Sequence, residues 1–310
     1  MLLQPLAMLL VISLGTVAVR LDGNPILTPN SSASLGTNIN GPSLVRVPDW
    51  VPHPLGRYYL YFAHHKGPSI RLAYANRLTG PWTVYEPGTL KLSDAPACVD
   101  HIASPDVHVD TASHQIRMYY HCPTDARDAE NSQRTFVATS KDGIHFASGA
   151  TPLGPYYFRV FRWAGYHYAI ARGGVFLRSR DGTSPFEEGP SLFSSDPRYL
   201  LRHAAVDVRR NTLSVYYSRI GDCPERIMVS RVQLTSDWTK WRASDPEDVL
   251  RPELEYEGGR LPLKPSETSL ASGPVRELRD PAIFREGGRT YLLYSIAGES
   301  GLAIAELQAK

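Results

Sequence analysis

Short runs of alternating apolar and polar residues, separated by turn-forming pairs, recur along the whole chain. The clearest unit is residues 278–295, LRDPAIFREGGRTYLLYS, in which an Asp-Pro step leads into a short apolar run. A Gly-Gly pair and an aromatic-rich run, TYLLYS, follow. Asp-Pro and Gly-Gly pairs are turn signals, and runs of this length and composition are typical of strands. The pattern predicts two strands joined by a tight turn.

Four looser copies of this unit precede it, at residues 40–64, 104–122, 157–171 and 203–219. Each copy is followed by a further strand-like run, such as IRLAYA, TFVATS or RIMVSRV. Repeats at intervals of roughly 40–60 residues, each with about four short strands, are typical of β-propellers. We therefore predict an all-β, five-bladed β-propeller with no helix longer than about three turns. An irregular β-sandwich built from similar hairpins is the alternative.

The length favours one domain, because 310 residues with 42% hydrophobic positions can bury a large core but leave no room for a second domain. The first four blades are expected to end near Tyr85, Phe146, Gly189 and Trp241. Residues 23–29, GNPILTP, are expected to form a strand that completes blade five and closes the ring. A Pro- and Glu-rich connector at residues 245–274 precedes blade five, and connectors of this length are usually functional.

The first 18 residues carry no charge and are strongly apolar up to Leu14. This pattern predicts a secretory signal peptide at residues 1–18 and a mature domain at 19–310. The run is too short for a transmembrane helix, so we expect a secreted or periplasmic protein that is free of the membrane after cleavage. Asn30-Ser31-Ser32 is an N-glycosylation sequence in a eukaryotic secretory route.

The three cysteines, Cys98, Cys122 and Cys223, fit no zinc-binding spacing. In an exported protein Cys98 and Cys122 could close a loop beside blade two and leave Cys223 free, and three unpaired thiols are the alternative.

The net charge of +2 and the lack of a basic stripe argue against a nucleic-acid partner. No glycine-rich phosphate loop supports nucleotide chemistry. We expect a monomer without a required cofactor or a protein metal site, although a central-channel cation such as calcium, held partly by His203, is compatible with the sequence.

Polar residues stand where the inner strand of each expected blade begins. In a propeller these strand starts face one mouth of the central channel, so side chains from different blades converge there. The strand starts carry Asn40, Asp106, Arg159, His203, Arg279 and Asp280, and the second strands end at or near His64, His121, Asp222 and Glu225. Such a ring suits a carboxylate-based hydrolase, in which one acid protonates a leaving oxygen and a carboxylate activates water or attacks.

The strand starts resemble those of the five-bladed furanosidase-type glycosidases, of which glycoside hydrolase family 43 is the nearest. The resemblance rests on the Asp-Pro steps, on SPDV at residues 104–107 and on RDPAIF at 279–284, and as a repeat pattern it covers most of the chain. It implies hydrolysis of furanosides or short oligosaccharides that contain arabinose, xylose or galactose. In that family a base Asp lies on blade one, an orienting Asp on blade two and an acid Glu further round. Blade one departs from the pattern, because NGPS at residues 40–43 stands where Asp-Pro-Ser is expected.

The resemblance makes Asp106, Asp280 and Glu225 the candidate catalytic residues, with Glu257 and then Asp222 as alternative acids. The candidate substrate-binding residues are Asn40, His64, His101, Arg159, His203 and Arg279. We expect Asp106 and Asp280 to face one pocket with their carboxylates within about 10 Å of each other. Each carboxylate also has a structural interpretation: Asp106 could cap a turn, Asp280 could pair with Arg279, and Glu225 could pair with Arg226 or Arg219.

Two functions without catalysis remain open at this point. The missing blade-one carboxylate is compatible with a non-catalytic carbohydrate-binding propeller. A scaffold propeller that binds protein is the third interpretation, but its channel would not need so many ionisable groups.

Overall fold

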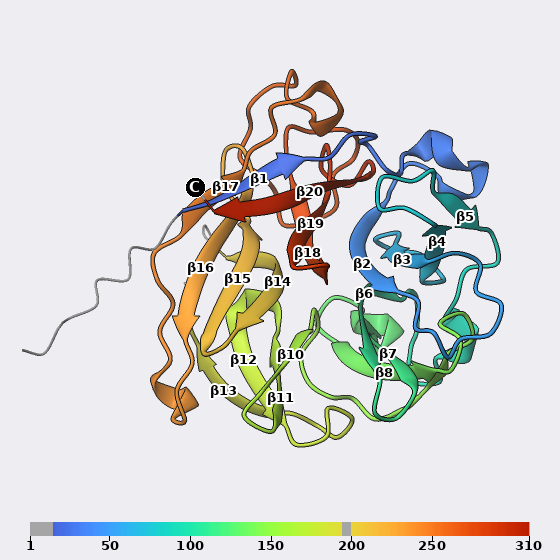
Figure 1. Cartoon of the computed structure of the whole chain (residues 1–310), viewed down its shortest axis with the longest axis vertical. Helices are drawn as coiled ribbons and strands as arrows, with labels where there is room; N and C mark the ends of the chain where they lie inside the picture. Colours follow the sequence, from blue (N-terminus) through green and yellow to red (C-terminus); the bar gives the residue numbers. More distant parts are fainter. Residues whose placement is uncertain (1–14, 194–199, 310) are drawn as a thin grey trace, which may run out of the picture.

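The computed structural model describes residues 15–193 and 200–309. Five four-stranded antiparallel sheets are arranged in a ring (Figure 1). This confirms the predicted all-β, five-bladed β-propeller and excludes the sandwich. Within the described ranges the helical segments are 3-10 turns, with no α-helix. None of these segments is long and apolar enough to cross a membrane.

The blades follow the chain in order, each with its first strand innermost. Blade one contains β2 (Asn40–Arg46), β3 (Tyr58–Ala63), β4 (Arg71–Ala75) and β5 (Thr83–Tyr85). Blade two contains β6 (Ala103–Asp110), β7 (Gln115–Pro123), β8 (Gln133–Ser140) and β9 (Ala147–Ser148). Blade three contains β10 (Arg159–Trp163), β11 (Tyr166–Ile170), β12 (Val175–Ser179) and β13 (Glu187–Ser191). Blade four contains β14 (Leu201–Arg209), β15 (Thr212–Arg219), β16 (Ile227–Gln233) and β17 (Glu247–Leu250).

Blade five is built from both ends of the described chain. It contains β18 (Arg279–Glu286), β19 (Arg289–Ser295), β20 (Leu302–Ala309) and, as the outer strand, β1 (Thr16–Arg20). β1 pairs antiparallel with β20, so the blue and red ends of the ribbon lie side by side (Figure 1). The ring is thus closed by residues 16–20 and not by residues 23–29, as the sequence had led us to expect.

Residues 23–29 pack beside β20 without becoming a strand. Two of their positions, Pro25 and Pro29, have no backbone N–H to donate to a ladder. Asn24 supplies the contacts through its side chain, which donates to the Ile304 carbonyl over 2.8 Å and accepts from the Ile304 amide over 2.9 Å. The expected signal peptide lies mostly outside the described residues, and its boundary after residue 18 falls inside β1.

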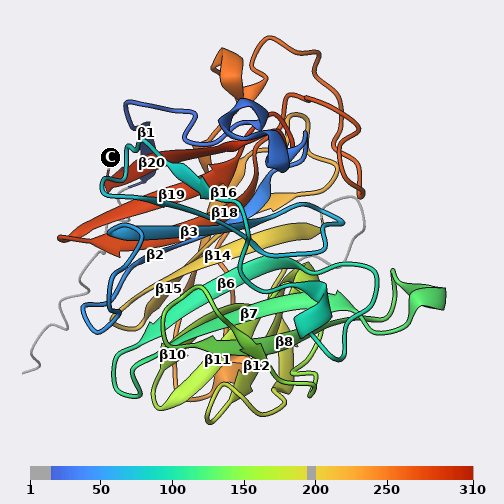
Figure 2. The ribbon, with the colours of Figure 1, turned by 90° about the vertical axis from the view of Figure 1, so that its right-hand side faces the viewer.

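Blade four also extends further than expected. The stretch around Trp238 forms η7 (Trp238–Lys240), whose tryptophan is buried, and the fourth strand follows as β17. The Pro- and Glu-rich connector therefore begins after Leu250. The connector and the β7–β8 loop, which carries η4 (Ala126–Asp128), project from the same face of the ring (Figure 2).

Five hydrophobic clusters hold the ring together, one at each interface between neighbouring blades. Between blades one and two, for example, Tyr61 and Leu72 pack with Met118 and Phe136. The middle strands are buried on both faces, which is why β3 reads as an unbroken apolar run, YYLYFA. Burial of these faces between blades fixes each blade relative to its neighbours.

Cys98 and Cys122 form a disulfide with a Cα–Cα distance of 5.5 Å, and Cys223 is free and exposed. The disulfide fastens the segment that leads into β6 to the end of β7. This outcome agrees with the first of the two alternatives that the cysteine count left open.

Candidate active site

The inner strands of four blades share a local distortion at their start. A register shift falls between Asn40 and Ser43 in β2, and at the matching places in β6, β14 and β18. In three of these blades the residue before proline has a positive φ: 60° at Gly41, 51° at Ser104 and 50° at Asp280. Residues other than glycine rarely adopt such angles, and they persist where the surrounding structure imposes them. Because the bulge falls at the same register in each of these blades, Gly41, Ser104 and Asp280 occupy equivalent positions.

A cavity of about 630 Å³ lies where the blades converge. All five blades or the loops that join them contribute to its wall. The lining residues that bear on the chemistry are His65, Lys66, Asp100, His101, Glu130, Gln133, Tyr156, Tyr157, Arg172, Arg202, His203, Glu267 and Glu299.

A smaller cavity of about 50 Å³ shares part of this wall. His65, His101, Tyr157 and His203 line both cavities. Asn40, Ala103, Ser104 and His121 line only the smaller one, and they come from the inner strands of blades one and two or from β7. The two cavities therefore form a polar funnel, rich in imidazoles, that narrows between the inner strands.

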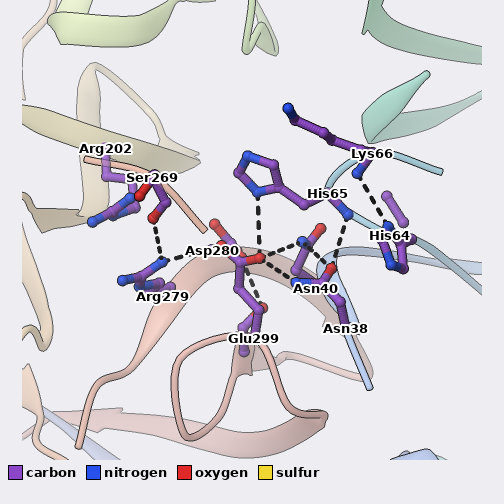
Figure 3. Close-up of polar contacts among 12 residues, drawn as sticks. Asn38, Asn40, His64, His65, Lys66, Arg202, Ser269, Arg279, Asp280 and Glu299 are labelled. Carbon is purple, nitrogen blue, oxygen red and sulfur yellow. Dashed lines mark hydrogen bonds and ion pairs between the residues drawn. The ribbon is translucent and has the colours of Figure 1, made fainter. Parts of the chain in front are cut away.

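Glu299, in the turn between β19 and β20, is the most strongly held carboxylate of the cavity wall (Figure 3). Asn38 and Asn40 donate to its Oε2 over 2.6 and 3.1 Å, and His65 Nδ1 lies 3.3 Å from the same oxygen. Arg279 Nη1 lies 3.1 Å from its Oε1. Burial alone would raise the pKa of Glu299, but the hydrogen bond and charge of His65, together with Arg279, lower it to about 2. The side chain is therefore ionised at neutral pH.

Arg279 is the centre of a buried ion-pair network behind the cavity. Its guanidinium contacts Glu299, donates to Glu277 over 2.8 Å from Nε, and lies 3.5 Å from Glu225. Arg202 extends the network by donating to both carboxylate oxygens of Glu225 over 2.8 and 3.1 Å. The network balances three glutamates with two arginines and holds Glu299 in place.

His203 and Asp280 form a second polar pair, next to this network. Asp280 is 1% exposed, and its carboxylate accepts from His203 Nδ1 in a very short contact and from the Ser295 hydroxyl over 2.9 Å. Burial would raise the pKa of Asp280, but the charge and hydrogen bond of His203 and the bond from Ser295 hold it well below its usual range. Burial lowers the pKa of His203 more than Asp280 raises it, so the imidazole is neutral at pH 7.

This pairing fixes which nitrogen of His203 carries the proton. Nδ1 donates to the carboxylate, and Nε2 is left as an acceptor. Nε2 is buried and has no hydrogen-bond partner among the described residues. The ring of Tyr157 packs edge-to-face against the imidazole at a centroid distance of 3.9 Å. A carboxylate that orients a neutral histidine, whose second nitrogen is free, is an arrangement suited to taking a proton.

Asp106 lies elsewhere. It accepts from the backbone amide of Val160, in β10, over 2.7 Å and from His108 Nε2 over 2.8 Å, and it lines neither cavity. Burial would raise its pKa, and His108 and Arg159 lower it. The register explains the difference from our expectation, because the residue equivalent to Asp280 is Ser104, and Asp106 is equivalent to Ala282. Asp106 thus fastens blade two to blade three. Neither carboxylate lines either cavity, and Asp280 is connected to the cavity wall only through His203, so the shared pocket that we expected is not found.

Glu225 and its two alternatives are also engaged in structural contacts. Glu225 is fully buried against Arg202 and accepts from the Ser218 hydroxyl over 2.6 Å, so its partner is not Arg226. Glu257 accepts from Arg20 over 2.7 Å and from Tyr294 over 3.0 Å, which ties the connector to blade five. Asp222 pairs with Arg219 and Arg226. None of the three lines either cavity.

The expected substrate-binding residues divide in the same way. His101 and His203 line both cavities and Asn40 the smaller one, whereas Arg279 and Arg159 line neither. Arg159 is buried, and its Nη1 donates to the Ser104 and Phe158 carbonyls. His64 lines a separate groove of about 740 Å³ that Glu299 also borders.

Sequence analysis missed Glu299 and His65. Both follow the second strand of a blade, the position at which His64, Asp222 and Glu225 had drawn attention. The same rule applied to blade five leads directly to the turn IAGES, which contains Glu299. The position of Glu299 after a second strand could therefore have identified it, but in blade five we considered only the Asp-Pro step at the start of the inner strand.

The donors of the smaller cavity do not form a calcium site. Calcium prefers six to eight oxygen ligands. This cavity presents four imidazoles, His65, His101, His121 and His203, and no carboxylate. Across the described ranges, no group of three or more His, Cys, Asp or Glu side chains is placed to hold a metal ion. A cation in the channel stays a prediction from the sequence.

No known family profile matches the sequence. Among solved structures, the chain is similar to a protein described under the GH130 family of mannoside phosphorylases and glycoside hydrolases that target β-1,2 mannosidic linkages in Candida mannan, with a TM-score of 0.65, 14% identity and 93% of each chain covered. It is also similar to a GH43 β-xylosidase/α-arabinofuranosidase from a compost microbial metagenome (TM-score 0.60, 14% identity, 94% of this chain and 95% of that one). A GH43 enzyme from Xanthomonas citri in complex with xylose gives 0.59, 12% identity and coverage of 88% and 87%. These likenesses show the fold, a glycosidase-like propeller.

A curated relative covers nearly the whole sequence. The uncharacterized protein R118 of Acanthamoeba polyphaga mimivirus is 39% identical over 325 aligned positions, which include 93% of this chain and 90% of the relative. Identity at this level over almost the full length reflects a shared fold and descent. The chain belongs to the same protein family as R118, a family whose fold is the five-bladed propeller of the GH43 and GH130 enzymes.

Proposed function

We propose that the protein is a glycosidase that binds a carbohydrate in the 630 Å³ cavity and cleaves a glycosidic bond there. The observation that carries the proposal is that Glu299, an ionised carboxylate, and His203, which Asp280 orients from behind, line one polar funnel. The likeness to GH43 and GH130 propellers supports the choice of substrate class. Short oligosaccharides of xylose, arabinose, galactose or mannose are the first substrates to examine.

The roles follow from protonation. Glu299 is negative at neutral pH, so it can stabilise the positive charge that develops at the anomeric carbon or attack that carbon. His203, neutral and oriented by Asp280, can accept a proton from an attacking water through Nε2. Neither group can donate the proton that a leaving sugar oxygen needs. Glu130 and Glu267, two exposed carboxyl groups on the cavity wall, are the candidates for that donor.

A carbohydrate-binding protein without catalysis is the second candidate. The observation in its favour is that the positions equivalent to Asp280 are Gly41 in blade one and Ser104 in blade two, neither of which is acidic. Such a protein would keep the cavity and lose the chemistry.

A panel of nitrophenyl glycosides and reduced oligosaccharides separates the two functions. We expect turnover of at least one substrate, and its loss in both Glu299→Gln and His203→Ala. Glu130→Gln and Glu267→Gln should be compared on a nitrophenyl glycoside and on an oligosaccharide, because a poor leaving group depends most on the acid. Saturable glycan binding without turnover by the wild-type protein would establish the binding function instead.

We propose further that the protein works outside the cytosol as a monomer. The Cys98–Cys122 disulfide supports an oxidising compartment. Fractionation of the native host or secretion from a eukaryotic cell line, with mass analysis of the N-terminus and of Asn30, would test the location. Light scattering would test the oligomeric state.

A further inference from the structure

We infer that the substrate is an acidic saccharide, whose carboxylate, phosphate or sulfate group is bound by Arg172 together with Lys66. The saccharide part of this inference rests on the proposed function, and the anionic part rests on the cavity wall itself.

Arg172 is a half-buried cation that faces the cavity without a carboxylate partner. It begins η5 (Arg172–Gly174), just after β11, and its guanidinium carbon lies 5.2 Å from the centre of the Tyr156 ring. Within the described part of the chain the Arg172 side chain takes part in no ion pair and in no hydrogen bond. Burial, followed by the charge of Arg202, lowers the pKa of Arg172. A guanidinium held in this way lacks the paired acceptors that its fork of donors favours.

The other arginines near the cavity are already neutralised. Arg202 is bound to Glu225 through two hydrogen bonds, and Arg279 is surrounded by three glutamates. The positive charges of these two arginines are balanced by the glutamates of the network. Arg172 therefore differs from them in having positive charge available for a ligand.

Lys66 supplies a second available cation. It follows His65 in the β3–β4 loop, is exposed, lines the cavity, and takes part in no ion pair within the described ranges. His65, by contrast, contacts Glu299. An anion between Arg172 and Lys66 would meet a planar donor fork and a compact ammonium, a combination that suits a carboxylate, phosphate or sulfate.

The acidic residues of the wall do not cancel this charge. Asp100 contacts His101 Nδ1 at 2.7 Å, and Glu299 is enclosed by its own donors. Glu130 and Glu267 are exposed to solvent. Of these, Glu130 is the rival partner for Arg172, because its charge acts on the guanidinium from nearby. The experiment must therefore separate a ligand site from an exposed Arg172–Glu130 pair.

Binding is measured by calorimetry, without turnover, on the intact chain. The probes are methyl glucuronide, glucose 6-phosphate and glucose 6-sulfate, each against the matching neutral sugar, and inorganic phosphate alone. The variants are Arg172→Ala, Arg172→Lys and Glu130→Gln. Arg180→Ala is the matched control, since Arg180 also stacks on a tyrosine, with its guanidinium carbon 3.8 Å from the centre of Tyr166, and lines a different depression.

We expect at least one acidic sugar to bind the wild-type protein about tenfold or more tightly than its neutral counterpart, and less tightly as salt is added. Arg172→Ala should remove this preference, Arg172→Lys should restore part of it, and Arg180→Ala should leave it in place. Glu130→Gln, which removes a negative charge close to Arg172, should keep or increase it. The acidic sugar that binds most tightly relative to its neutral counterpart identifies the anionic group.

Equal binding of acidic and neutral sugars by the wild-type protein would overturn the inference, whatever the variants do. Tighter binding of inorganic phosphate than of every acidic sugar would overturn the saccharide assignment, and an equal effect of Arg180→Ala would overturn the role of Arg172. Because no reaction is measured, a failure of catalysis leaves this test intact. Cleavage of neutral glycosides without any acidic preference would support the proposed function and reject this inference.

Discussion

The amide Nδ2 of Asn40 donates a 3.1 Å hydrogen bond to Oε2 of Glu299. Asn40 opens the inner strand of blade one, where the resemblance to family 43 led us to expect an acidic residue nearby. Glu299 reaches the same region from the opposite end of the chain, on blade five. The negative charge that blade one lacks is thus supplied by its neighbour, and the asparagine supports that charge.

Glu299→Gln is expected to lower turnover by at least about 100-fold, the usual scale for a group that takes part directly in proton transfer or charge stabilisation. Glutamine keeps the shape of the side chain but removes the charge that faces the cavity. Glu277→Gln is the matched control, because Glu277 also binds Arg279 but lines neither cavity. Steady-state rates on the best substrate, with melting curves for both variants, check the prediction. Similar losses in the two variants would assign Glu299 to the ion-pair network alone.

Asp106→Asn and Asp280→Asn are expected to separate structure from chemistry. Asp106 bridges two blades, so its variant should lose about 1–3 kcal/mol of unfolding free energy with little change in kcat. Asp280 orients His203, so its variant should lose kcat even where the protein stays folded. Urea unfolding and kinetics on both proteins provide the measurement. A larger kcat loss in Asp106→Asn would return that residue to the catalytic site.

Stability is expected to fall in two stages as the pH is lowered. Burial, with the charges of His101 and His203, holds the pKa of His121 well below 6.5 in the folded protein. Below about pH 6.5 the His121 imidazole therefore binds a proton in the unfolded chain but not in the folded one, and the free energy of unfolding declines. Glu299 has a pKa of about 2 in the folded protein and an ordinary pKa of 4.5 in the unfolded chain, so its contribution to stability is present above pH 4.5 and is lost toward pH 2.

Urea midpoints between pH 7.5 and 3.5 would show the first stage and the beginning of the second. His121→Phe should reduce the change between pH 7 and 5 and leave the more acidic part unaltered, and the lowered pKa of His203 accounts for a remaining change in the first stage. An unchanged profile in this variant would show that other groups govern the first stage.

Reduction of the Cys98–Cys122 disulfide is expected to cost roughly 3 kcal/mol of unfolding free energy. The bond closes a loop with a sequence separation of 24 residues, and the estimate follows from the loop entropy that the unfolded chain regains. The double variant Cys98→Ser, Cys122→Ser should show the same loss without reductant. Cys223→Ser, at an exposed free thiol, should unfold at the wild-type midpoint. A reductant effect that persists in the double variant would point to another cause.

Blade number and strand order were predictable because both depend on local patterns. The alternation of apolar and polar residues, with turn-forming pairs between the runs, specifies each hairpin. Each blade then buries its two faces against its neighbours in the same way. The closing strand was not predictable in this way. Residues 23–29 read as a short apolar strand, whereas most of residues 16–20 had been assigned to the signal peptide, and only the pairing with β20, at the far end of the chain, identifies them as the closing strand.

The site was predictable as a region and not as a set of residues. The rule that strand starts converge on the channel found Asn40 and His203, which line the smaller cavity, and Asp280, which lies behind His203 and binds it. It misplaced Asp106, because the pairing of β6 with β7 makes Ser104, and not Asp106, the residue equivalent to Asp280. It also overlooked Glu299, whose significance depends on three partners that are distant in sequence.

The pairing of β1 with β20 also determines when the protein can become complete during its synthesis. Arg20 is made early but pairs with Ala305, and Thr16 pairs with Ala309, so the ring stays open until the final strand has left the ribosome. Until then β1 and β19 each present an unpaired edge to other chains, and open edges of this kind are templates for aggregation. A chain that ended before residue 302 would lose β20 whole and keep both edges exposed permanently.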